Sequence, residues 1–485
     1  MTDIDPRLKD LADLFPDDYS EEQTAAAKTM FLRKLSLLMH RFYRGKMMTV
    51  PKAGIWGMNW FNVWYTPGVS KVSTTIRDDN STSFGLSNRG NLVGIVSDST
   101  RVLGDGDCTP PGGLGVMEGK AFLMKYLGGV DATALCIDNR DERGEPDADR
   151  IIDFVRMAAP SFGAINLEDI SQPNCYRVLD TLREECDIPV WHDDAQGTGC
   201  VTVAGLLGAL EVVGRKLGEA RMVFIGAGAS NTTIARLIIR AGGDPAKMVM
   251  FDSRGALSKR RDDIRDDPRY YRKWEICRTT NPDCVQTPGE AVRGADALIA
   301  VSRPGPGLIP PEWIRSMADD PIVFACANPV PEIYPFRARE AGAAVVATGR
   351  GDFPNQVNNS LGFPGILKGA LLVRATSITD GMAVAAARSL AESARKRGLR
   401  PDYIIPTMEE ADVFPREAAD VAEQAIREGV ARRKKGREQL IREASRDIRE
   451  ARELVDMLMD SGVIRRPPQE LLEKALKETL GEIGG

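Results

Sequence analysis

The sequence predicts an α/β protein with two domains and a helical C-terminal extension, and three observations lead to this prediction. The chain has 485 residues, which is too long for a single hydrophobic core. Short apolar runs alternate with helical stretches in two series, one between about residues 92 and 200 and one from residue 221 onward. This alternation is typical of largely parallel sheets covered by helices. After about residue 430, dense charges of both signs with Leu, Ile and Val at helical spacing indicate helices with one solvated face.

Each element is expected from its own local pattern. Good helix formers with a period of about 3.6 predict a helix at 20–45. Strands of the first series are expected at four short apolar runs: 92–98, 132–138, 162–169 and 188–191. Helices between and after them are expected at 118–129, 151–160, 175–186 and 202–214. The strands of the second series are expected at 221–228, 248–252, 297–301, 322–327 and 343–348.

These elements define the predicted domain boundaries. The first α/β domain is expected at 18–199, the second at 200–435 and the charged helical extension at 436–485. We expect the extension to dock on the body or on another copy rather than to bind nucleic acid.

Composition excludes several classes of protein. A net charge of −5 argues against a basic nucleic-acid binder. The acidic N-terminus MTDIDPRLKDLADLF and the strand-sized apolar runs predict neither a signal peptide nor a membrane span. The eight cysteines form no CxxC pair and there are only two histidines, so we expect neither a disulfide framework nor a zinc site, and a cytoplasmic location.

Two pairs of acidic residues follow two of the expected strands. Asp193 and Asp194 stand in WHDDAQGTG, and Glu168 and Asp169 end the run AINLED. Ligands of open α/β sheets lie at the carboxyl ends of the strands, so the two pairs can converge on one point. Carboxylate oxygens suit Mg²⁺ or Mn²⁺ better than zinc. The simpler alternative is that each pair caps a helix.

A glycine turn after residue 225 indicates dinucleotide binding. Gly226 allows a tight turn, Gly228 lets a pyrophosphate approach the helix N-terminus, and Asp252 ends the next strand, where it can accept from a ribose 2′-hydroxyl. Asn231 stands where the fingerprint has a small residue, which predicts a helix further from the sheet or weaker cofactor binding.

Several blocks of the chain, in order from Tyr65 to Ala431, resemble malic enzymes. These blocks are YTPGVS, VMEGKAFLMKYLGGVDA, INLEDIS, IPVWHDDAQGTG, FACANPVPEI and GDFPNQVNNSLGFPGILKGALLVRAT. The unusual Gly- and Pro-rich segment 105–115, the charged segment 258–290 and the C-terminal extension depart from that pattern.

The resemblance implies a role for each matching residue. Glu168, Asp169 and Asp194 would bind the divalent ion, and Asp193 would orient the catalytic lysine or a ligand. Lys120 of the MEGK block would be the general base. Tyr65 would be the general acid. Substrate contacts would come from Arg101, Asn328 and Asn359, and cofactor contacts from Gly226, Gly228, Ser230, Asn231, Asp252 and Asn328.

The resemblance also implies the reaction and its cofactors. We expect oxidative decarboxylation of malate to pyruvate and CO₂ by a homodimer or higher homo-oligomer, with NAD as cofactor, because Asp252 repels the 2′-phosphate of NADP. NADP remains the alternative, since Arg254 can offset that repulsion. A relative acting on another 2-hydroxy acid, or forming lactate with retained NAD, is the second hypothesis. A catalytically silent metabolite-binding protein is the third, and it gives no chemical reason to keep Tyr65, Lys120 and the acid residues together.

Overall fold

Two β-sheets form the framework of the larger of the two units into which the chain divides, Val50–Arg449. The computed structural model describes residues 4–103 and 105–483. The first sheet has the strand order β2-β1-β3-β4 and is parallel throughout. Its strands are β1 Leu92–Ser97, β2 Asp131–Cys136, β3 Ala164–Leu167 and β4 Val190–His192.

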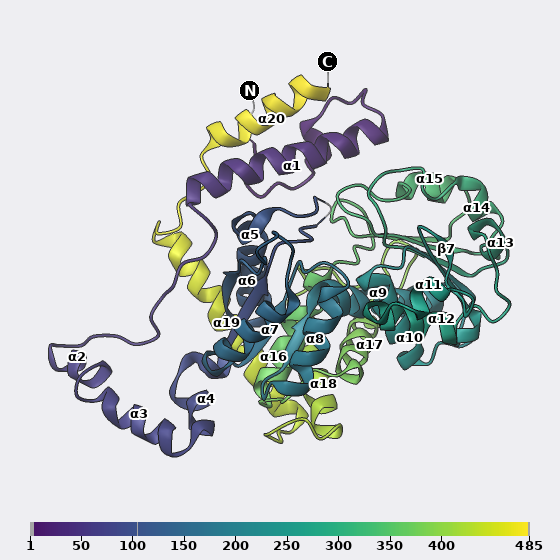
Figure 1. Ribbon diagram of the computed structural model, residues 1–485. Helices are drawn as coiled ribbons and strands as arrows, with labels where there is room; N and C mark the ends of the chain where they lie inside the picture. The colour runs from purple at the N-terminus through teal and green to yellow at the C-terminus, as the bar shows by residue number, and fades with distance from the viewer. Residues whose placement is uncertain (1–3, 104, 484–485) are drawn as a thin grey trace. The chain divides into compact units, whose positions relative to one another are not determined.

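Helices cover both faces of the first sheet (Figure 1). Side chains alternate between the faces of a strand, so Val93 and Ile95 of β1 join one core cluster and Val96 joins another. The first cluster contains residues of α6 Leu114–Gly128, α9 Thr198–Val212 and α16 Phe363–Leu372. The second contains residues of α7 Ala148–Ala158 and α8 Asn174–Glu185.

The second sheet has the strand order β10-β9-β8-β5-β6-β7. Its strands are β5 Met222–Ile225, β6 Met248–Asp252, β7 Gly255–Ala256, β8 Ala297–Ala300, β9 Ile322–Ala325 and β10 Val345–Thr348. All pairings are parallel except β6 with β7. The strand order reverses beside β5, which is followed by α10 Ala229–Ala241, and this reversal is where doubly wound sheets bind nucleotides.

The remaining helices of the larger unit connect and flank the two sheets. They are α2 Asn59–Trp64, α3 Val69–Asp78, α4 Ser83–Leu86, α5 Thr109–Gly112, α11 Asp262–Arg265, α12 Tyr271–Thr279, α13 Pro288–Ala291, α14 Pro311–Arg315, α15 Pro335–Glu340, α17 Asp380–Arg397 and α18 Val413–Arg427. Residues 50–78, which include α2 and α3, extend away from the sheets and form an arm (Figure 1).

The two ends of the chain form the smaller unit, Met1–Thr49 with Glu450–Gly485. Its helices are α1 Glu21–Tyr43 and α20 Gln469–Ile483, and the chain enters it within α19 Arg437–Asp460. Ser20 and Gln23 form a capping box that starts α1, and Phe31 and Leu35 of α1 share a core with Leu472 of α20. The helix expected at 20–45 is therefore present, and it packs with the C-terminal extension.

The fold confirms the predicted α/β class with C-terminal helices. The domain boundaries 18–199, 200–435 and 436–485 stay a prediction. Among the described residues, one helical stretch, Asp193–Val212, is long and apolar enough to cross a membrane, but 78% of its apolar 18-residue segment is buried inside the protein, as in an ordinary core helix.

Candidate active site

The two acidic pairs lie together because β3 and β4 are neighbours. Leu167, the last residue of β3, is in register with His192, the last residue of β4. Glu168 and Asp193 therefore leave the sheet side by side, since parallel strands end at the same edge. Asp193 opens a π-helical turn, Asp193–Gly197, that leads into α9.

Three of the four carboxylates form a compact cluster. Glu168, Asp169 and Asp194 each place one oxygen so that these atoms all lie within 4.8 Å of one another. The backbone N–H of Asp169 donates to Oδ2 of Asp194 at 2.7 Å, so Asp194 accepts from another strand end rather than from its own helix. Asp169 Oδ2 is buried and has no hydrogen-bond partner among the described residues. A buried carboxylate oxygen without a donor, beside two further carboxylates, fits a divalent cation with oxygen ligands.

Lys120 reaches this cluster from α6. Its Nζ donates to Oδ2 of Asp193 and lies 3.0 Å from Oε1 of Glu168. Trp191 Nε1 donates to the other oxygen of Asp193 at 3.0 Å, so both oxygens of that carboxylate are engaged. Lys120 Nζ also lies 4.7 Å from the centre of the Phe363 ring. Asp193 thus contacts the lysine, and sequence reasoning did not single out Trp191 or Phe363.

Burial and mutual repulsion control the charges of the cluster. Burial, followed by the charge of Asp194, raises the pKa of Glu168 and brings the pKa of Asp169 to about 8. Burial alone lowers the pKa of Lys120, but the charges of Asp193 and Glu168 outweigh it and the net shift is upward. The cluster without a cation therefore favours a charged lysine and a protonated carboxyl group.

His192 does not take part in this network. It is buried, and among the described residues neither ring nitrogen forms a hydrogen bond. Its Nδ1 lies 3.8 Å from Oδ2 of Asp194, and burial lowers its pKa. His192 is thus a neutral packing residue in this arrangement.

The glycine turn after β5 has the backbone that the fingerprint requires. Gly226 has φ +97°, and a Cβ there would lie 2.7 Å from the carbonyl oxygen of Val301. A Cβ on Gly228 would meet nothing within 4 Å, which leaves space for a ligand at the start of α10. Asn231 is buried, and its Nδ2 donates to the carbonyl groups of Ile225 and Gly226 at 2.9 and 2.8 Å. Asn231 therefore fixes the turn, a role that the fingerprint does not predict.

A hydrogen bond joins the glycine turn to the acid cluster. Ser230 Oγ, in the first turn of α10, donates to the carbonyl oxygen of Asp194 at 3.0 Å. A cofactor at the glycine turn would therefore lie next to the carboxylates.

Asp252, at the end of β6, is held by an arginine that sequence reasoning missed. Arg261 donates to both of its oxygens, at 2.9 and 3.0 Å, and also pairs with Asp263. Arg254 is close to Asp252 through its backbone N–H, which donates to Oδ1 of Asp252 at 2.9 Å, while its side chain lies 3.3 Å from Asp263. The only sequence signal for Arg261 is its place in the charged run SKRRDD.

Comparisons with known proteins agree with this geometry. One family model, "Malic enzyme, N-terminal domain", matches residues 53–183, and another, "Malic enzyme, NAD binding domain", matches residues 195–426. A Bacillus subtilis protein named bifunctional malic/malolactic enzyme is 41% identical over 404 residues, which are 83% of this chain and 95% of that protein. The chain belongs to the malic enzyme family. An NAD-dependent malic enzyme of Geobacillus stearothermophilus is 42% identical over 399 residues, 82% of this chain and 80% of that protein.

Solved structures of malic enzymes share the fold. The crystal structure of Entamoeba histolytica malic enzyme matches with a TM-score of 0.98 and 60% identity over 100% of both chains. That of Pyrococcus horikoshii malic enzyme matches with a TM-score of 0.80 and 42% identity, over 90% of this chain and 96% of that chain. The family predicted from the sequence is confirmed.

The expected substrate contacts Asn328 and Asn359 differ in their surroundings. Asn359 lies near Asp193, because a Cβ on Gly197 would come 3.2 Å from Asn359 Cβ and also meet the Asp193 carboxylate. Asn328 is exposed in the segment after β9. That segment is fixed by Glu332, which accepts hydrogen bonds from backbone N–H groups after β8 and β9, and burial raises the pKa of Glu332 to about 6.

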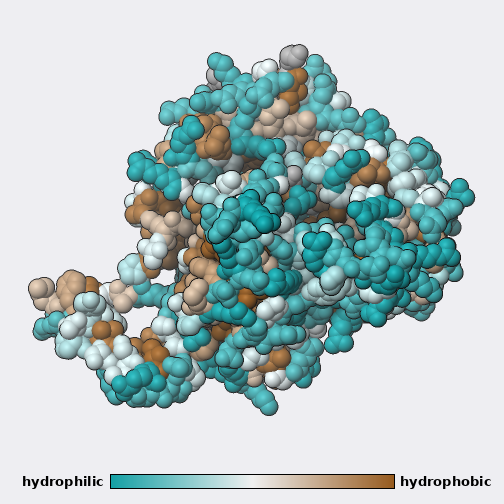
Figure 2. Space-filling view, in the orientation of Figure 1, coloured by the Kyte–Doolittle hydropathy of each residue, from teal (hydrophilic) through white to brown (hydrophobic). Residues whose placement is uncertain are grey.

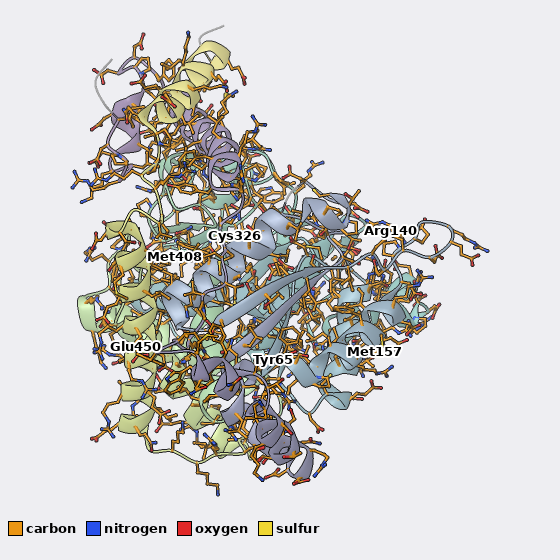
Figure 3. All side chains as sticks on the ribbon, turned by 90° about the vertical axis from the view of Figure 1, so that its left-hand side faces the viewer. Tyr65, Arg140, Met157, Cys326, Met408 and Glu450 are labelled. Atoms are coloured by element: carbon orange, nitrogen blue, oxygen red, sulfur yellow. The ribbon has the colours of Figure 1, made fainter. Side chains whose placement is uncertain are left out.

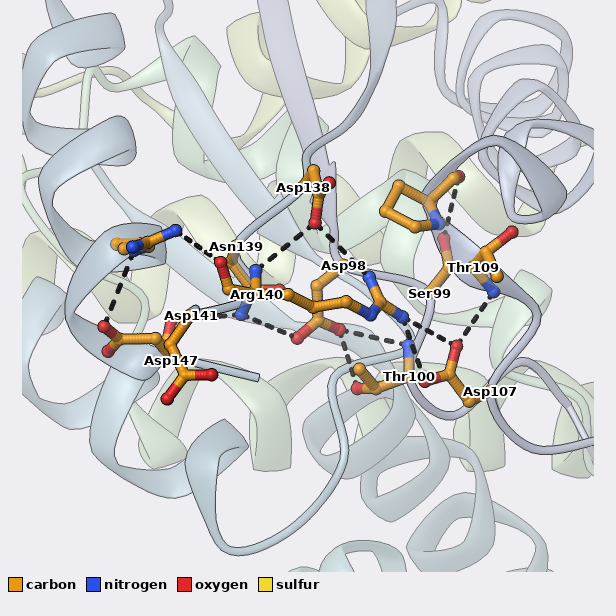
Figure 4. Close-up of polar contacts among 12 residues, drawn as sticks. Asp98, Ser99, Thr100, Asp107, Thr109, Asp138, Asn139, Arg140, Asp141 and Asp147 are labelled. Carbon is orange, nitrogen blue, oxygen red and sulfur yellow. Dashed lines mark hydrogen bonds and ion pairs between the residues drawn. The ribbon is translucent and has the colours of Figure 1, made fainter. Parts of the chain in front are cut away.

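Arg101 is the residue that the resemblance to malic enzymes places at a carboxylate of the substrate. It lies in a loop fixed by polar contacts (Figure 4). Its own backbone N–H donates to the carbonyl oxygen of Asp169 at 3.0 Å, while its side chain is exposed. Asp98 is buried and accepts from Thr100 and from Nδ2 of Asn139. Arg140 pairs with Asp107 at 2.8 Å, which anchors the Gly- and Pro-rich segment that follows Arg101.

Tyr65, the general acid implied by the resemblance to malic enzymes, does not lie in the cluster. It follows α2 on the arm, its side chain is 75% exposed, and Figure 3 shows it at the surface. The structure thus brings together Lys120, the acid trio of Glu168, Asp169 and Asp194, and the glycine turn, but not Tyr65.

Proposed function

We propose that this protein catalyses the metal-dependent oxidative decarboxylation of malate to pyruvate and CO₂, with reduction of NAD or NADP. The observation that carries the proposal is the position of Lys120, which contacts Asp193 and one member of the acid trio, Glu168. The trio is joined through Ser230 to the glycine turn. A base, a cation site and a nucleotide site therefore adjoin one another, which is what oxidation of a hydroxy acid requires.

Lys120 is the base of the oxidation step. It takes the proton of the substrate hydroxyl while the hydride leaves C2 for the nicotinamide, which gives a 2-keto acid and reduced cofactor. Lys120 can do this only when neutral, and the contacts with Asp193 and Glu168 favour its charged form. Glu168, Asp169 and Asp194 would hold a divalent cation, which would supply positive charge that offsets these carboxylates and would act as a Lewis acid toward the substrate.

The second half of the reaction needs a proton donor. The β-carboxylate leaves as CO₂, and the electron pair of the broken C–C bond forms the enolate of pyruvate. A proton delivered to C3 then gives pyruvate, and Tyr65 is the candidate donor on the family resemblance.

The preference between NAD and NADP depends on Asp252 and Arg261. The carboxylate of Asp252 favours NAD, because the 2′-phosphate of NADP carries a like charge. Arg261 contacts both oxygens of that carboxylate and reduces the repulsion. We propose NAD as the better substrate, with NADP also used.

Lactate formation from malate with retained NAD is the second candidate, because the Bacillus subtilis relative is named a bifunctional malic/malolactic enzyme. We further propose a homo-oligomer located in the cytoplasm, where thiols stay reduced, since all eight cysteines are unpaired.

A product assay tests the proposed function. Purified protein is incubated with malate, Mn²⁺ and either NAD or NADP, and reduced cofactor, pyruvate and lactate are measured. We expect equal amounts of pyruvate and reduced cofactor, and no product from a Lys120→Ala variant. Lactate without net cofactor reduction would support the second candidate, and no turnover of malate would contradict both.

A further inference from the structure

A group of basic side chains in the larger unit has no acidic partners. Charged and polar side chains cover most of the visible face of that unit (Figure 2), and arginines of the chain commonly pair with carboxylates, as Arg156, Arg272 and Arg395 do. Five neighbouring cations differ, because none of them places a nitrogen within 4.0 Å of a carboxylate oxygen of the described residues. We call them the basic cluster: Arg89, Arg374, Arg432, Arg433 and Lys434.

Backbone pairing brings the two halves of the basic cluster together. The segments that follow α16 and α18 are joined by an antiparallel β-bridge. The N–H of Arg432 donates to the carbonyl oxygen of Arg374 at 3.4 Å, and the N–H of Arg433 donates to that of Val373 at 3.0 Å. Arg374 also has φ +49°, which is uncommon for a residue with a β-carbon. The main chain therefore holds these three arginines close to one another.

The aromatic ring of Phe84 fixes two of the guanidinium groups. Cζ of Arg89 lies 4.3 Å and Cζ of Arg374 lies 5.2 Å from the centre of that ring. Arg89 also donates to the carbonyl oxygen of Phe162 at 3.1 Å and to Oγ of Ser83 at 2.8 Å. All of these partners are neutral. The two guanidinium groups are therefore held in place while their positive charges stay uncompensated.

The charges of the basic cluster repel one another. Burial, followed by the charge of Arg432, lowers the pKa of Arg89. Burial, followed by the charges of Arg433 and Arg432, lowers the pKa of Arg374. The charge of Asp187 acts on Arg89 in the opposite direction, but it is the carbonyl oxygen of Asp187 that accepts from Arg432, at 2.6 Å. Because arginine stays charged in proteins, this repulsion is relieved only by an anion from outside the chain.

The basic cluster lies at the opposite edge of the first sheet from the acid cluster. Arg89 precedes β1, and its acceptor Phe162 precedes β3, whereas Glu168 follows β3. Asp187, the acceptor of Arg432, precedes β4. Parallel strands place their amino ends at one edge of a sheet and their carboxyl ends at the other. An anion bound by the basic cluster would therefore occupy a site separate from the candidate active site.

We propose that the basic cluster binds a compact anion with two or more phosphate groups, either an inorganic polyphosphate or the phosphate chain of a nucleotide. Guanidinium groups suit phosphate, since each can donate two parallel hydrogen bonds to it. One phosphate group carries about −1.5 to −2 near pH 7, so five cations suit more than one. The net charge of −5 repels nucleic acid and anionic membranes, whereas a compact anion senses mainly the charges within about 8–10 Å.

Calorimetric titration with inorganic triphosphate, at low salt and without divalent cations, tests the proposal. We expect saturable binding that weakens as salt is added. Arg433→Gln should weaken it at least about tenfold, because a hydrogen bond between charged groups is lost. The Arg433 side chain forms no hydrogen bond or ion pair within the described chain, so this variant should fold. Arg395→Gln, which removes an exposed arginine paired with Glu211, is the control and should bind as the wild type does. Equal affinities of the wild type and Arg433→Gln would overturn the proposal.

Competing ligands separate the basic cluster from other phosphate sites. The glycine turn after β5 is the other place that suits phosphate, so the titration is repeated with saturating NAD, and we expect triphosphate binding to persist. Loss of binding in the presence of NAD would overturn the proposal. GTP, whose base differs from the adenine of NAD, distinguishes the two sources of the anion: tighter binding than triphosphate indicates a nucleotide, and equal binding indicates the phosphate chain alone. Binding of single-stranded RNA or phosphatidylserine vesicles without binding of triphosphate would overturn the proposal.

Thermal unfolding distinguishes a binding role of the basic cluster from a structural one. Without ligand and at low salt, Arg433→Gln should have a higher Tm than the wild type, because one of several repelling charges is removed. Triphosphate at 100 times its Kd should raise the Tm of the wild type by about 3 °C and that of the variant by less. A lower Tm of Arg433→Gln without ligand would show that this charge stabilises the fold by itself, and would overturn the proposal.

Discussion

Lys120 and Tyr65 are the two side chains that the family resemblance assigns to proton transfer, and they lie in opposite surroundings. Lys120 is buried, with its ammonium group between two carboxylates and beside an aromatic ring. Tyr65 is three-quarters exposed on an arm whose contacts are local. Lys120 is therefore positioned by the core of its own chain, whereas Tyr65 is not. This difference teaches that two residues matched by the same family resemblance need not be brought together by the chain that carries them.

The largest effects should come from removing the two residues separately. Lys120→Ala should abolish reduction of NAD by malate but leave protonation of the enol, whereas Tyr65→Phe should slow chiefly the exchange of tritium from water into pyruvate. Each defect should be about 10²–10⁴-fold, the usual contribution of a general acid or base. Reduced cofactor and tritium exchange are measured for both variants beside decarboxylation of added oxaloacetate. Tritium exchange at the wild-type rate in Tyr65→Phe would exclude Tyr65 as the acid.

The cation site should depend on the trio but not on Asp193. Replacing a residue that only hydrogen-bonds to a metal ligand lowers metal affinity by about 10–100-fold. Asp194→Asn removes one of the expected ligands and should therefore weaken Mn²⁺ binding by more than this. Asp193→Asn is the matched control, since Asp193 contacts Lys120 and Trp191 rather than the open side of the cluster. Free Mn²⁺ measured by electron paramagnetic resonance gives both affinities. Equal losses in the two variants would contradict the assignment of ligands.

The pH dependence of Mn²⁺ binding tests the raised pKa of the buried Asp169 carboxyl group. The pKa of Asp169, raised by burial and by Asp194 to about 8, lies above that of an exposed Asp. Its proton therefore stabilises the metal-free fold below about pH 4, and this contribution is lost as the pH rises through about 8. Because a cation must displace that proton, Mn²⁺ affinity should rise about tenfold per pH unit between about pH 6 and 8. A flat profile over this interval would show that Asp169 is ionised in the metal-free protein.

The smallest effect is expected at the largely buried pair of Asp252 and Arg261. Arg261→Ala should lower kcat/KM with NADP about fivefold more than with NAD, because about 1 kcal/mol of compensating charge is lost near the surface. Arg269→Ala, which removes an exposed partner of Asp267, serves as the control. An unchanged ratio of the two kcat/KM values would show that Arg261 does not influence the cofactor preference.

Local patterns in the sequence were sufficient for every strand except the two-residue β7, for the glycine turn and for the two acid pairs. Strand periodicity and the convergence of parallel strand ends do not depend on distant residues, so the proximity of Glu168 to Asp194 could be predicted. The roles of Lys120 and Tyr65 came instead from the family resemblance, because single Lys and Tyr residues carry no local signal.

Contacts between residues that are not neighbours along the sequence were decided only by the tertiary structure. Arg261 lies nine residues after Asp252, and Phe363 is more than 200 residues from Lys120, yet both pairs are in contact. The role of Asn231 also depends on tertiary structure, because its Nδ2 donates to carbonyl groups whose positions are set by the conformation of the glycine turn. The sequence by itself thus determined which residue types stand at the strand ends. The burial that sets their charges, and the exposure that leaves Tyr65 outside the site of its own chain, follow only from how the chain packs.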